Sequence, residues 1–168
     1  MSGRIFLLGD DIDTDQLAPG QYMKGGLEML AAHCLESARP DFAGSVKPGD
    51  VIVAGRNFGM GSSREQAAEA LRHLGIAGVA ARSFAGIFYR NALNLGLPVL
   101  VADNVDGIAD GDLAVLDPAA GELRLTGKNR TVLLEPLPDN LKRMLADGGL
   151  VPHLKKRFAE ERAKEAGA

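Results

Sequence analysis

Short, wholly apolar runs alternate with longer segments whose apolar residues recur three and four positions apart. The apolar runs have the length and composition of buried strands and cover residues 5–8, 51–54, 79–81 and 97–101. The segments with helical spacing, which we expect to be helices, cover residues 27–35, 63–74, 84–95 and 138–145. Because strands and helices alternate between residues 51 and 101, we expect right-handed crossovers and an α/β fold.

The chain changes character after residue 112. Apolar residues at 113–116, 123–125 and 132–134 are separated by a turn at Pro118-Ala119-Ala120-Gly121 and by polar residues, which predicts short strands joined by hairpin-like turns. The last residues carry charges of both signs and predict a charge-paired helix or a polar tail. We therefore expect one mixed α/β domain over residues 1–150 and a charged C-terminal helix or tail over residues 151–168.

The composition is that of one globular domain and excludes several classes of function. The chain has 168 residues, 46% of them hydrophobic and 24% charged, which is enough to form a core. Its net charge of −3 offers no basic excess for nucleic acid. No apolar run approaches the ~20 residues that span a bilayer. We therefore expect neither a nucleic-acid nor a membrane partner.

The single cysteine, Cys34, limits the metal chemistry of the chain. One thiol excludes a disulfide within the chain and fits a reducing compartment, so we expect a cytoplasmic protein. Iron–sulfur clusters and cysteine-rich zinc sites need several thiolates. We therefore expect no metal held by this chain alone and interpret Cys34 as a small buried apolar residue.

The most informative segment is the glycine-rich stretch at residues 55–65, between an expected strand and an expected helix. Backbone amides at such a helix start can bind an anion, and glycines let a ligand approach the backbone. A P-loop needs a lysine that this stretch lacks. The dinucleotide fingerprint needs a third glycine where Arg64 stands. We therefore exclude nucleotide binding.

Two serines and an arginine remain at this helix start. Ser62 and Glu65 have the spacing of a capping box, as do Ser63 and Gln66 one step on, and this spacing alone favours capping over catalysis. Arg64 has the planar donor geometry that binds a carboxylate. A serine nucleophile of the usual kind also needs a histidine base, and the pattern places no histidine near Ser62.

Three ordered motifs together resemble the aconitase family, and in particular its small subunits. The resemblance extends from about residue 5 to residue 149. The motifs are Asp13-Thr14-Asp15 followed by Pro19-Gly20, then Gly59-Met60-Gly61-Ser62-Ser63-Arg64-Glu65, and finally Arg82-Ser83-Phe84-Ala85-Gly86-Ile87-Phe88.

This resemblance implies a fold, an activity and a partner. The fold would be a swivelling β/β/α three-layer domain with a mixed sheet. The activity would be that of a hydro-lyase subunit, which adds or removes water on a hydroxy di- or tricarboxylic acid. The four-iron four-sulfur cluster would be carried by a partner large subunit, and this chain would close over it.

The resemblance also assigns roles to individual residues. Ser62 resembles the family's base, which takes the proton next to a carboxylate. Ser63 and Arg64 resemble the groups that bind a substrate carboxylate. Asp15 matches the active-site aspartate, and Thr14 lies beside it in the threonine–aspartate pair.

The stretch after Pro19-Gly20 resembles the segment that recognises the variable group of the substrate. Here it contains Tyr22, Met23 and Lys24. Met23 would give an apolar wall suited to 3-isopropylmalate, which is the expected acid, whereas Lys24 resembles in charge the arginine of homoaconitases. Met60 and Gln66 depart from residues common in the family, which leaves a methylated or dimethylated malate as a further alternative.

Other interpretations stay open at this stage. The aspartates at 11, 13 and 15 have calcium-loop spacing, but the turn glycine and the closing glutamate of such a loop are replaced by Gln16 and Tyr22. A non-catalytic carboxylate-binding or assembly module, with serines that only cap, is the alternative from another class. A free-standing hydrolase that uses Ser62 is a third. We also expect the isolated chain to form a weak homo-oligomer through its partner-binding face.

Overall fold

The computed structural model describes residues 2–166 and contains a curled seven-stranded sheet of order β4-β3-β2-β1-β5-β6-β7. Strands β1 to β4 pair in parallel, β5 pairs antiparallel with β1, and β6 and β7 continue the antiparallel part. The strands are β1 (Gly3–Leu7), β2 (Val51–Ala54), β3 (Gly78–Ala81), β4 (Val99–Val101), β5 (Leu113–Asp117), β6 (Glu122–Leu125) and β7 (Arg130–Leu133). The expected mixed sheet and its hairpins are confirmed.

Helices join the parallel strands and extend the C-terminus. They are α1 (Thr14–Leu17), the 3₁₀ helix η1 (Gly20–Gly25), α2 (Gly26–Ala32), α3 (Phe42–Ser45), α4 (Gln66–His73), α5 (Gly86–Asn94), α6 (Asp139–Ala146) and α7 (Leu150–Ala166). Helix α4 follows β2 and α5 follows β3, which is the expected strand–helix alternation.

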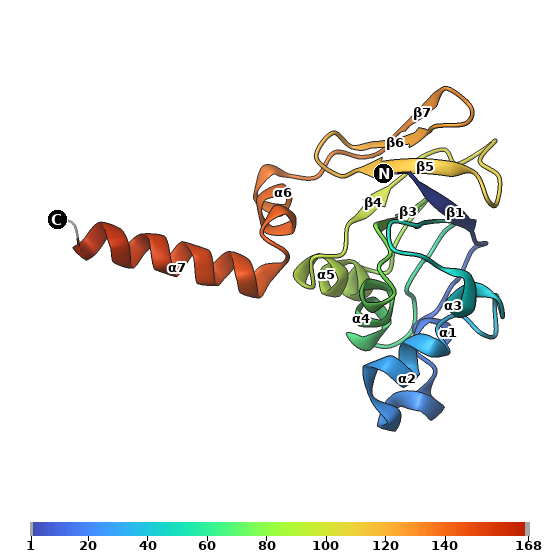
Figure 1. The fold of residues 1–168 in the computed structure, drawn as a ribbon, viewed down its shortest axis with the longest axis horizontal. Coiled ribbons are helices and arrows are strands. Elements are labelled where there is room, and N and C mark those ends of the chain that lie inside the picture. The colour runs from blue at the N-terminus through green and yellow to red at the C-terminus, as the bar shows by residue number, and fades with distance from the viewer. Residues whose placement is uncertain (1, 167–168) are drawn as a thin grey trace.

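The parallel sheet lies between two layers because its residues alternate between its faces. Phe6 and Ile52 point into a core that α2, α4 and α5 cover, and Phe6 packs edge-on against Phe42 with ring centroids 4.8 Å apart. Val51 and Val53 point the other way, into a second core that includes residues of β5, β6 and β7. Figure 1 shows the antiparallel strands on one side of the parallel strands and α4 and α5 on the other. The β/β/α layering is therefore confirmed.

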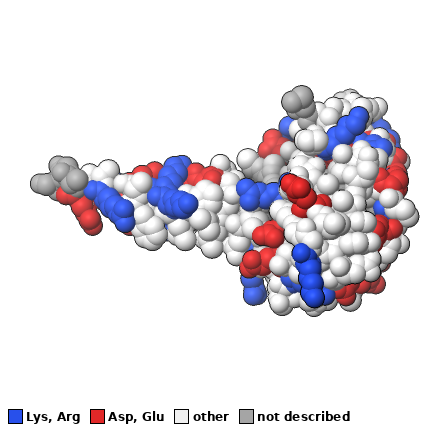
Figure 2. Space-filling view, turned by 60° about the horizontal axis from the view of Figure 1, so that its bottom comes forward, with Lys and Arg blue, Asp and Glu red and all other residues white. Residues whose placement is uncertain are grey.

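Helix α7 projects away from the rest of the molecule (Figure 1). It touches α5 and α6 near its start, and Val151 and Phe158 lie exposed on it. Figure 2 shows basic and acidic side chains close together along its length. The helix begins earlier than the charged residues, and the division of the chain near residue 150 stays a prediction.

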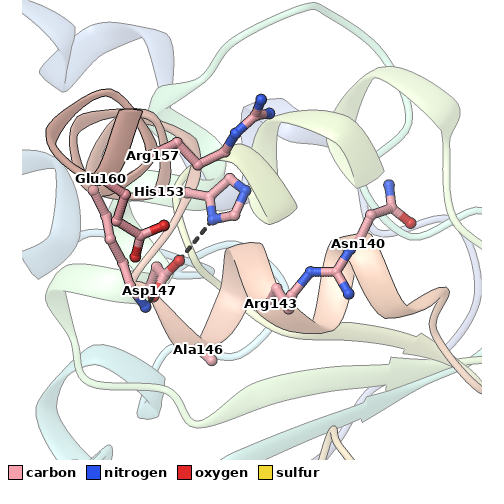
Figure 3. A pocket seen from close by; sticks show the side chains of 8 residues that line it. Asn140, Arg143, Ala146, Asp147, His153, Arg157 and Glu160 are labelled. Atoms are coloured by element: carbon pink, nitrogen blue, oxygen red, sulfur yellow. Dashed lines mark hydrogen bonds and ion pairs between the residues drawn. The ribbon is translucent and has the colours of Figure 1, made fainter. Parts of the chain in front are cut away.

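A carboxylate at the end of α6 connects this helix to α7. Asp147 accepts a hydrogen bond from Lys156 Nζ at 2.7 Å and lies 2.6 Å from Nδ1 of His153. These two partners lower the pKa of Asp147 below its ordinary value. Figure 3 shows His153 pointing at Asp147, with Arg143 earlier on α6. The start of α7 is thus held both by these charged groups and by Leu150, which packs against the helix-side core.

Candidate active site

The three sequence motifs meet at one edge of the parallel sheet. The glycine loop (residues 55–65) follows β2, and the other two motifs follow β1 and β3. On one side of the glycine loop, the amide of Thr14 donates to the carbonyl of Met60 at 2.8 Å. On the other side, the amide of Phe58 donates to the carbonyl of Ser83 at 3.0 Å. Loops that follow neighbouring parallel strands emerge at the same edge, which is where α/β proteins commonly bind ligands.

Two glycines give this loop a path that other residues would block. Gly59 has φ +80°, and a Cβ there would lie 2.1 Å from the ring of Phe88. Gly61 has φ +107°, and a Cβ there would lie 3.0 Å from Oγ1 of Thr14. Such backbone angles favour glycine. The loop can therefore pack tightly between α5 and α1 and still present Ser62 at the surface.

Ser62 is hydrogen-bonded to the buried hydroxyl of Thr14. Thr14 is 1% exposed, and its Oγ1 accepts from the amide of Ser62 at 3.0 Å. The same oxygen lies 2.9 Å from Oγ of Ser62. A hydroxyl has one proton and two lone pairs, so Thr14 can accept from the amide and donate its proton to Ser62 Oγ. With its proton in that direction, Thr14 would stabilise negative charge on the Ser62 oxygen.

Arg64 lies beside this pair and is already bound to a carboxylate. Its Nη1 donates to Asp15 Oδ1 and, at 3.2 Å, to the carbonyl of Ala18. The side chain of Arg64 is 28% exposed, whereas that of Asp15 is 72% exposed. The guanidinium is therefore held in place by the protein, and its carboxylate partner Asp15 is open to solvent.

The structure corrects the expected helix caps. Helix α4 begins at Gln66 with Glu65 at its N-cap and without a side-chain capping bond, so neither Ser62 nor Ser63 caps it. The hydroxyl of Ser62 contacts Thr14 instead. The capping box that the structure does contain is at α1, where Asp13 Oδ1 accepts from the amide of Gln16 at 2.8 Å.

Ser63 differs from its neighbours in its contacts. Its side chain is exposed and makes no hydrogen bond within residues 2–166, while its carbonyl accepts from Asn91 Nδ2 at 3.3 Å. Asn91, on α5, therefore lies next to the glycine loop, and no local pattern in the sequence predicts this contact. Thr14 thus contacts Ser62, and its neighbour Asp15 contacts Arg64, with Ser63 exposed beside both pairs.

The expected substrate-recognition segment is η1. Tyr22 and Met23 are half-buried and pack against the helix-side core, whereas Lys24 is exposed. No carboxylate within residues 2–166 lies within ion-pair distance of Lys24. A Cβ on Gly20 would lie 3.7 Å from Nη2 of Arg64, which puts the start of η1 next to the arginine. Met23 and Lys24 therefore lie in the same short helix that begins beside Arg64, but they do not touch Ser62.

The donor groups of the described chain do not fit a metal centre of their own. Within residues 2–166, no group of three or more histidine, cysteine, aspartate or glutamate side chains could hold a metal ion. Cys34 is fully buried, and this burial raises the pKa of its thiol well above the ordinary value. His33 pairs with Glu36 and His153 with Asp147, and neither contacts Ser62. The side chain of His73, at the end of α4, makes no hydrogen bond within residues 2–166, so no histidine of the described chain is hydrogen-bonded to Ser62.

The fold and the site define an α/β domain that presents a serine–serine–arginine segment at the carboxyl edge of a parallel sheet. A family model described as the aconitase C-terminal domain matches residues 36–104. The methanogen homoaconitase small subunit of Methanothermobacter thermautotrophicus is 49% identical over 90% of this chain and 88% of that protein. The chain therefore belongs to the aconitase family, as the motifs predicted.

Two further relatives cover nearly the whole chain. The 3-isopropylmalate dehydratase small subunit 2 of Archaeoglobus fulgidus is 48% identical over 93% of this chain and 95% of that protein. The crystal structure of 3-isopropylmalate dehydratase from Methanocaldococcus jannaschii is 47% identical and superposes with a TM-score of 0.91, covering 97% of this chain and 98% of that one.

None of the helices in residues 2–166 is long and apolar enough to cross a membrane.

Proposed function

We propose that this chain is the small subunit of a hydro-lyase that removes water from, and returns it to, a hydroxy di- or tricarboxylic acid. The observation that carries the proposal is the contact between buried Thr14 and exposed Ser62, 2.9 Å apart, beside Arg64. Relatives named 3-isopropylmalate dehydratase and homoaconitase small subunits support this class of reaction. We assign 3-isopropylmalate, an acid of leucine biosynthesis, as the first substrate to test.

The proposed role of Ser62 is that of the base. Dehydration removes a proton from the carbon next to a carboxylate and hydroxide from the neighbouring carbon, and a carbon–carbon double bond forms. Ser62 Oγ, as the alkoxide, takes that proton and becomes the neutral hydroxyl. An alkoxide is too basic to persist in water, so it needs donors in a dry site. Thr14 Oγ1 is one such donor, and the Arg64 guanidinium supplies positive charge nearby.

The proposed role of Arg64 is to bind the substrate carboxylate. An arginine pairs with a carboxylate through two parallel N–H bonds. In the free chain, Asp15 occupies one of these positions. Because Asp15 is largely exposed, it can turn aside when a substrate carboxylate arrives, and Ser63 lies exposed next to the same place. Asp15 thus keeps Arg64 oriented before the substrate binds.

The proposed partner is a large subunit that carries a four-iron four-sulfur cluster. Cys34 is one buried thiol, so it cannot supply the ligands of a cluster. We assign no step on the departing hydroxide to this chain. Ser62, Ser63 and Arg64 stand at the edge of the sheet, where a second protein can cover them and exclude water. A cytoplasmic location also remains part of the proposal.

A reconstitution assay tests the proposal. The chain is mixed anaerobically with the cluster-bearing large subunit from the same source, and turnover is measured on isopropylmalate, homoaconitate, citraconate and dimethylmaleate. We expect turnover only when both chains are present. Ser62→Ala should abolish it while costing about 1 kcal/mol of stability, since one hydrogen bond is lost. Ser37→Ala, at an exposed serine outside the site, is the matched control.

The outcomes separate the alternatives. A complex with Ser62→Ala that turns over at the wild-type rate would show that the chain is a binding or assembly module. Preference for isopropylmalate would support Met23 as the apolar wall, and preference for homoaconitate would support Lys24 as the carboxylate partner. No turnover on any acid, with a large subunit shown to be competent, would overturn the proposed activity.

A further inference from the structure

A second group of side chains holds η1 from the side of α2. The ring of Tyr22 stacks on the ring of His33 with centroids 3.6 Å apart and planes 9° from parallel. Nδ1 of His33 lies 2.6 Å from Oε2 of Glu36. The other oxygen of Glu36 accepts from Gln21 Nε2 at 3.3 Å. We call these four residues the Glu36 clasp.

Apart from the clasp, η1 is held mainly by the packing of Tyr22 and Met23 against the helix-side core. Pro19 stands at the N-cap of η1 without a side-chain capping bond, and Gly25 and Gly26 follow Lys24. Gly26 has φ +82°. Short 3₁₀ helices have poor hydrogen-bond geometry, and glycine adds backbone freedom. The position of η1 therefore depends on what its side chains contact.

The segment that carries His33 and Glu36 is itself hydrogen-bonded to α1, the helix that carries Thr14 and Asp15. The amide of Leu35, between His33 and Glu36, donates to the carbonyl of Gln16 at 2.7 Å. Leu35 is fully buried. Gln16 belongs to α1, the helix that begins at Thr14 and carries Asp15. One rigid connection thus extends from α1 through residues 33–36 to Tyr22, and Met23 and Lys24 are the next residues.

We propose that His33 and Glu36 are positioning residues that set the substrate selectivity of the site. This inference rests on the proposed function, because it concerns how η1 faces the variable group of the acid. The stack on His33 fixes the ring of Tyr22, and Glu36 fixes both the imidazole and Gln21. Met23 and Lys24 are then presented to the substrate in one orientation. Without the clasp, η1 samples several positions and discriminates poorly between acids.

The isolated chain offers a test that needs no activity. Lys24 is exposed and lies next to Gly25, so the bond between them is a trypsin site whose cleavage requires local opening of η1. We expect His33→Ala to increase the rate of cleavage after Lys24 roughly tenfold, and Glu36→Ala to increase it less. His33→Phe keeps a ring for Tyr22 and should stay within about threefold of the wild type. His73→Ala, at an exposed histidine of α4, is the control and should leave cleavage unchanged.

The complex with the large subunit provides the second test. Because the clasp orients a binding segment, His33→Ala should raise KM for the preferred acid about tenfold and change kcat little. It should also reduce the preference between isopropylmalate and homoaconitate by a similar factor. His33→Phe should restore both values to within about threefold of the wild type.

These measurements separate failure of the clasp from failure of the proposed function. A wild-type complex that is inactive on every acid defeats the proposed function, while the trypsin rates still decide whether the clasp holds η1. Equal trypsin rates in wild type and His33→Ala would overturn the clasp. So would an active His33→Ala complex with wild-type KM and selectivity, or one whose kcat falls equally on every acid together with its thermal stability.

Discussion

Oγ1 of Thr14 lies 2.9 Å from Oγ of Ser62 and 3.0 Å from its amide nitrogen, although Thr14 is buried and Ser62 lies at the surface. One side chain therefore fixes both the backbone and the hydroxyl of the proposed base. The contact joins residues 48 positions apart in the chain. It places α1 and the glycine loop in a single unit, so a change in one alters the geometry of the other.

Thr14→Val should separate the hydroxyl from the shape of the side chain. Valine fills the same space but leaves the amide of Ser62 without its acceptor and Ser62 Oγ without its donor. We expect a loss of about 1–2 kcal/mol in the free energy of unfolding. We also expect a fall in kcat of roughly a hundredfold in the reconstituted complex, because the base is misplaced. Urea unfolding and steady-state turnover measure the two effects.

Thr14→Ser keeps the hydroxyl and provides the comparison. It should retain most of kcat even if the lost methyl group lowers stability. If Thr14→Val and Thr14→Ser had the same kcat, the hydroxyl would have no part in activating Ser62, and the proposed base would need another donor.

Gly61→Ala should strain the glycine loop. The backbone has φ +107° there, and the new Cβ would lie 3.0 Å from Oγ1 of Thr14. A non-glycine residue in such a conformation costs about 1–3 kcal/mol. We expect a lower free energy of unfolding by that amount, and lower turnover as Ser62 shifts.

Gly44→Ala is the matched control for this substitution. Gly44 lies in α3, has nothing within 4 Å of its would-be Cβ and shows no positive φ. Alanine is favoured over glycine in a helix by up to about 1 kcal/mol. Equal stability of the two alanine variants would show that Gly61 is not required by the backbone.

Apolar patterning alone was sufficient to predict the parallel part of the fold. Residues 51–54 are all apolar and form β2 with those bounds, because a strand buried on both faces leaves little ambiguity. The start of α4 was predicted wrongly, at Ser63 instead of Gln66. The local spacing fits a capping box, but the contact with Thr14, which decides the outcome, comes from a distant part of the chain.

Only part of the candidate site could be predicted, because several of its contacts also join distant parts of the chain. Thr14, Asp15, Ser62 and Arg64 were identified by motif, and the structure brings them together. The stack of Tyr22 on His33 and the bond from Asn91 to Ser63 have no sequence signal, since each joins separate elements through side chains of common types. Such contacts depend on how the layers pack, which one sequence does not encode in any local pattern.

Low pH should weaken the hydrogen bonds by which Asp110 joins the loop before β5 to β1. Asp110 accepts from Arg39 Nη2 and from the amide of Leu7, each at 2.9 Å. Arg39, and then the Leu7 amide, lower the pKa of Asp110 below its ordinary value. A lowered pKa in the folded state contributes stability above the unfolded value, about 3.9, and that stability is lost as the pH falls through the folded value.

Asp110→Asn removes this pH-dependent contribution. We expect the variant to be less stable than the wild type near neutral pH, and the difference in free energy of unfolding to shrink below about pH 4. Urea unfolding at a series of pH values measures it. Asp103→Asn, at an exposed position after β4, should follow the wild-type curve. A difference for Asp110→Asn that stays constant with pH would contradict the assigned role of the ion pair.

Cys34 should be chemically inert in the folded chain. It is fully buried, and burial raises the pKa of its thiol, whereas only the thiolate attacks a disulfide reagent readily. We expect labelling by an aromatic disulfide reagent at least roughly a hundredfold slower in the native chain than in urea, where one thiol should react. Cys34→Ala should leave turnover of the reconstituted complex unchanged. Fast labelling of the native chain would contradict the burial of this thiol. Loss of the complex's iron in Cys34→Ala would place the thiol at the cluster, and the assignment of all cluster ligands to the large subunit would then be wrong.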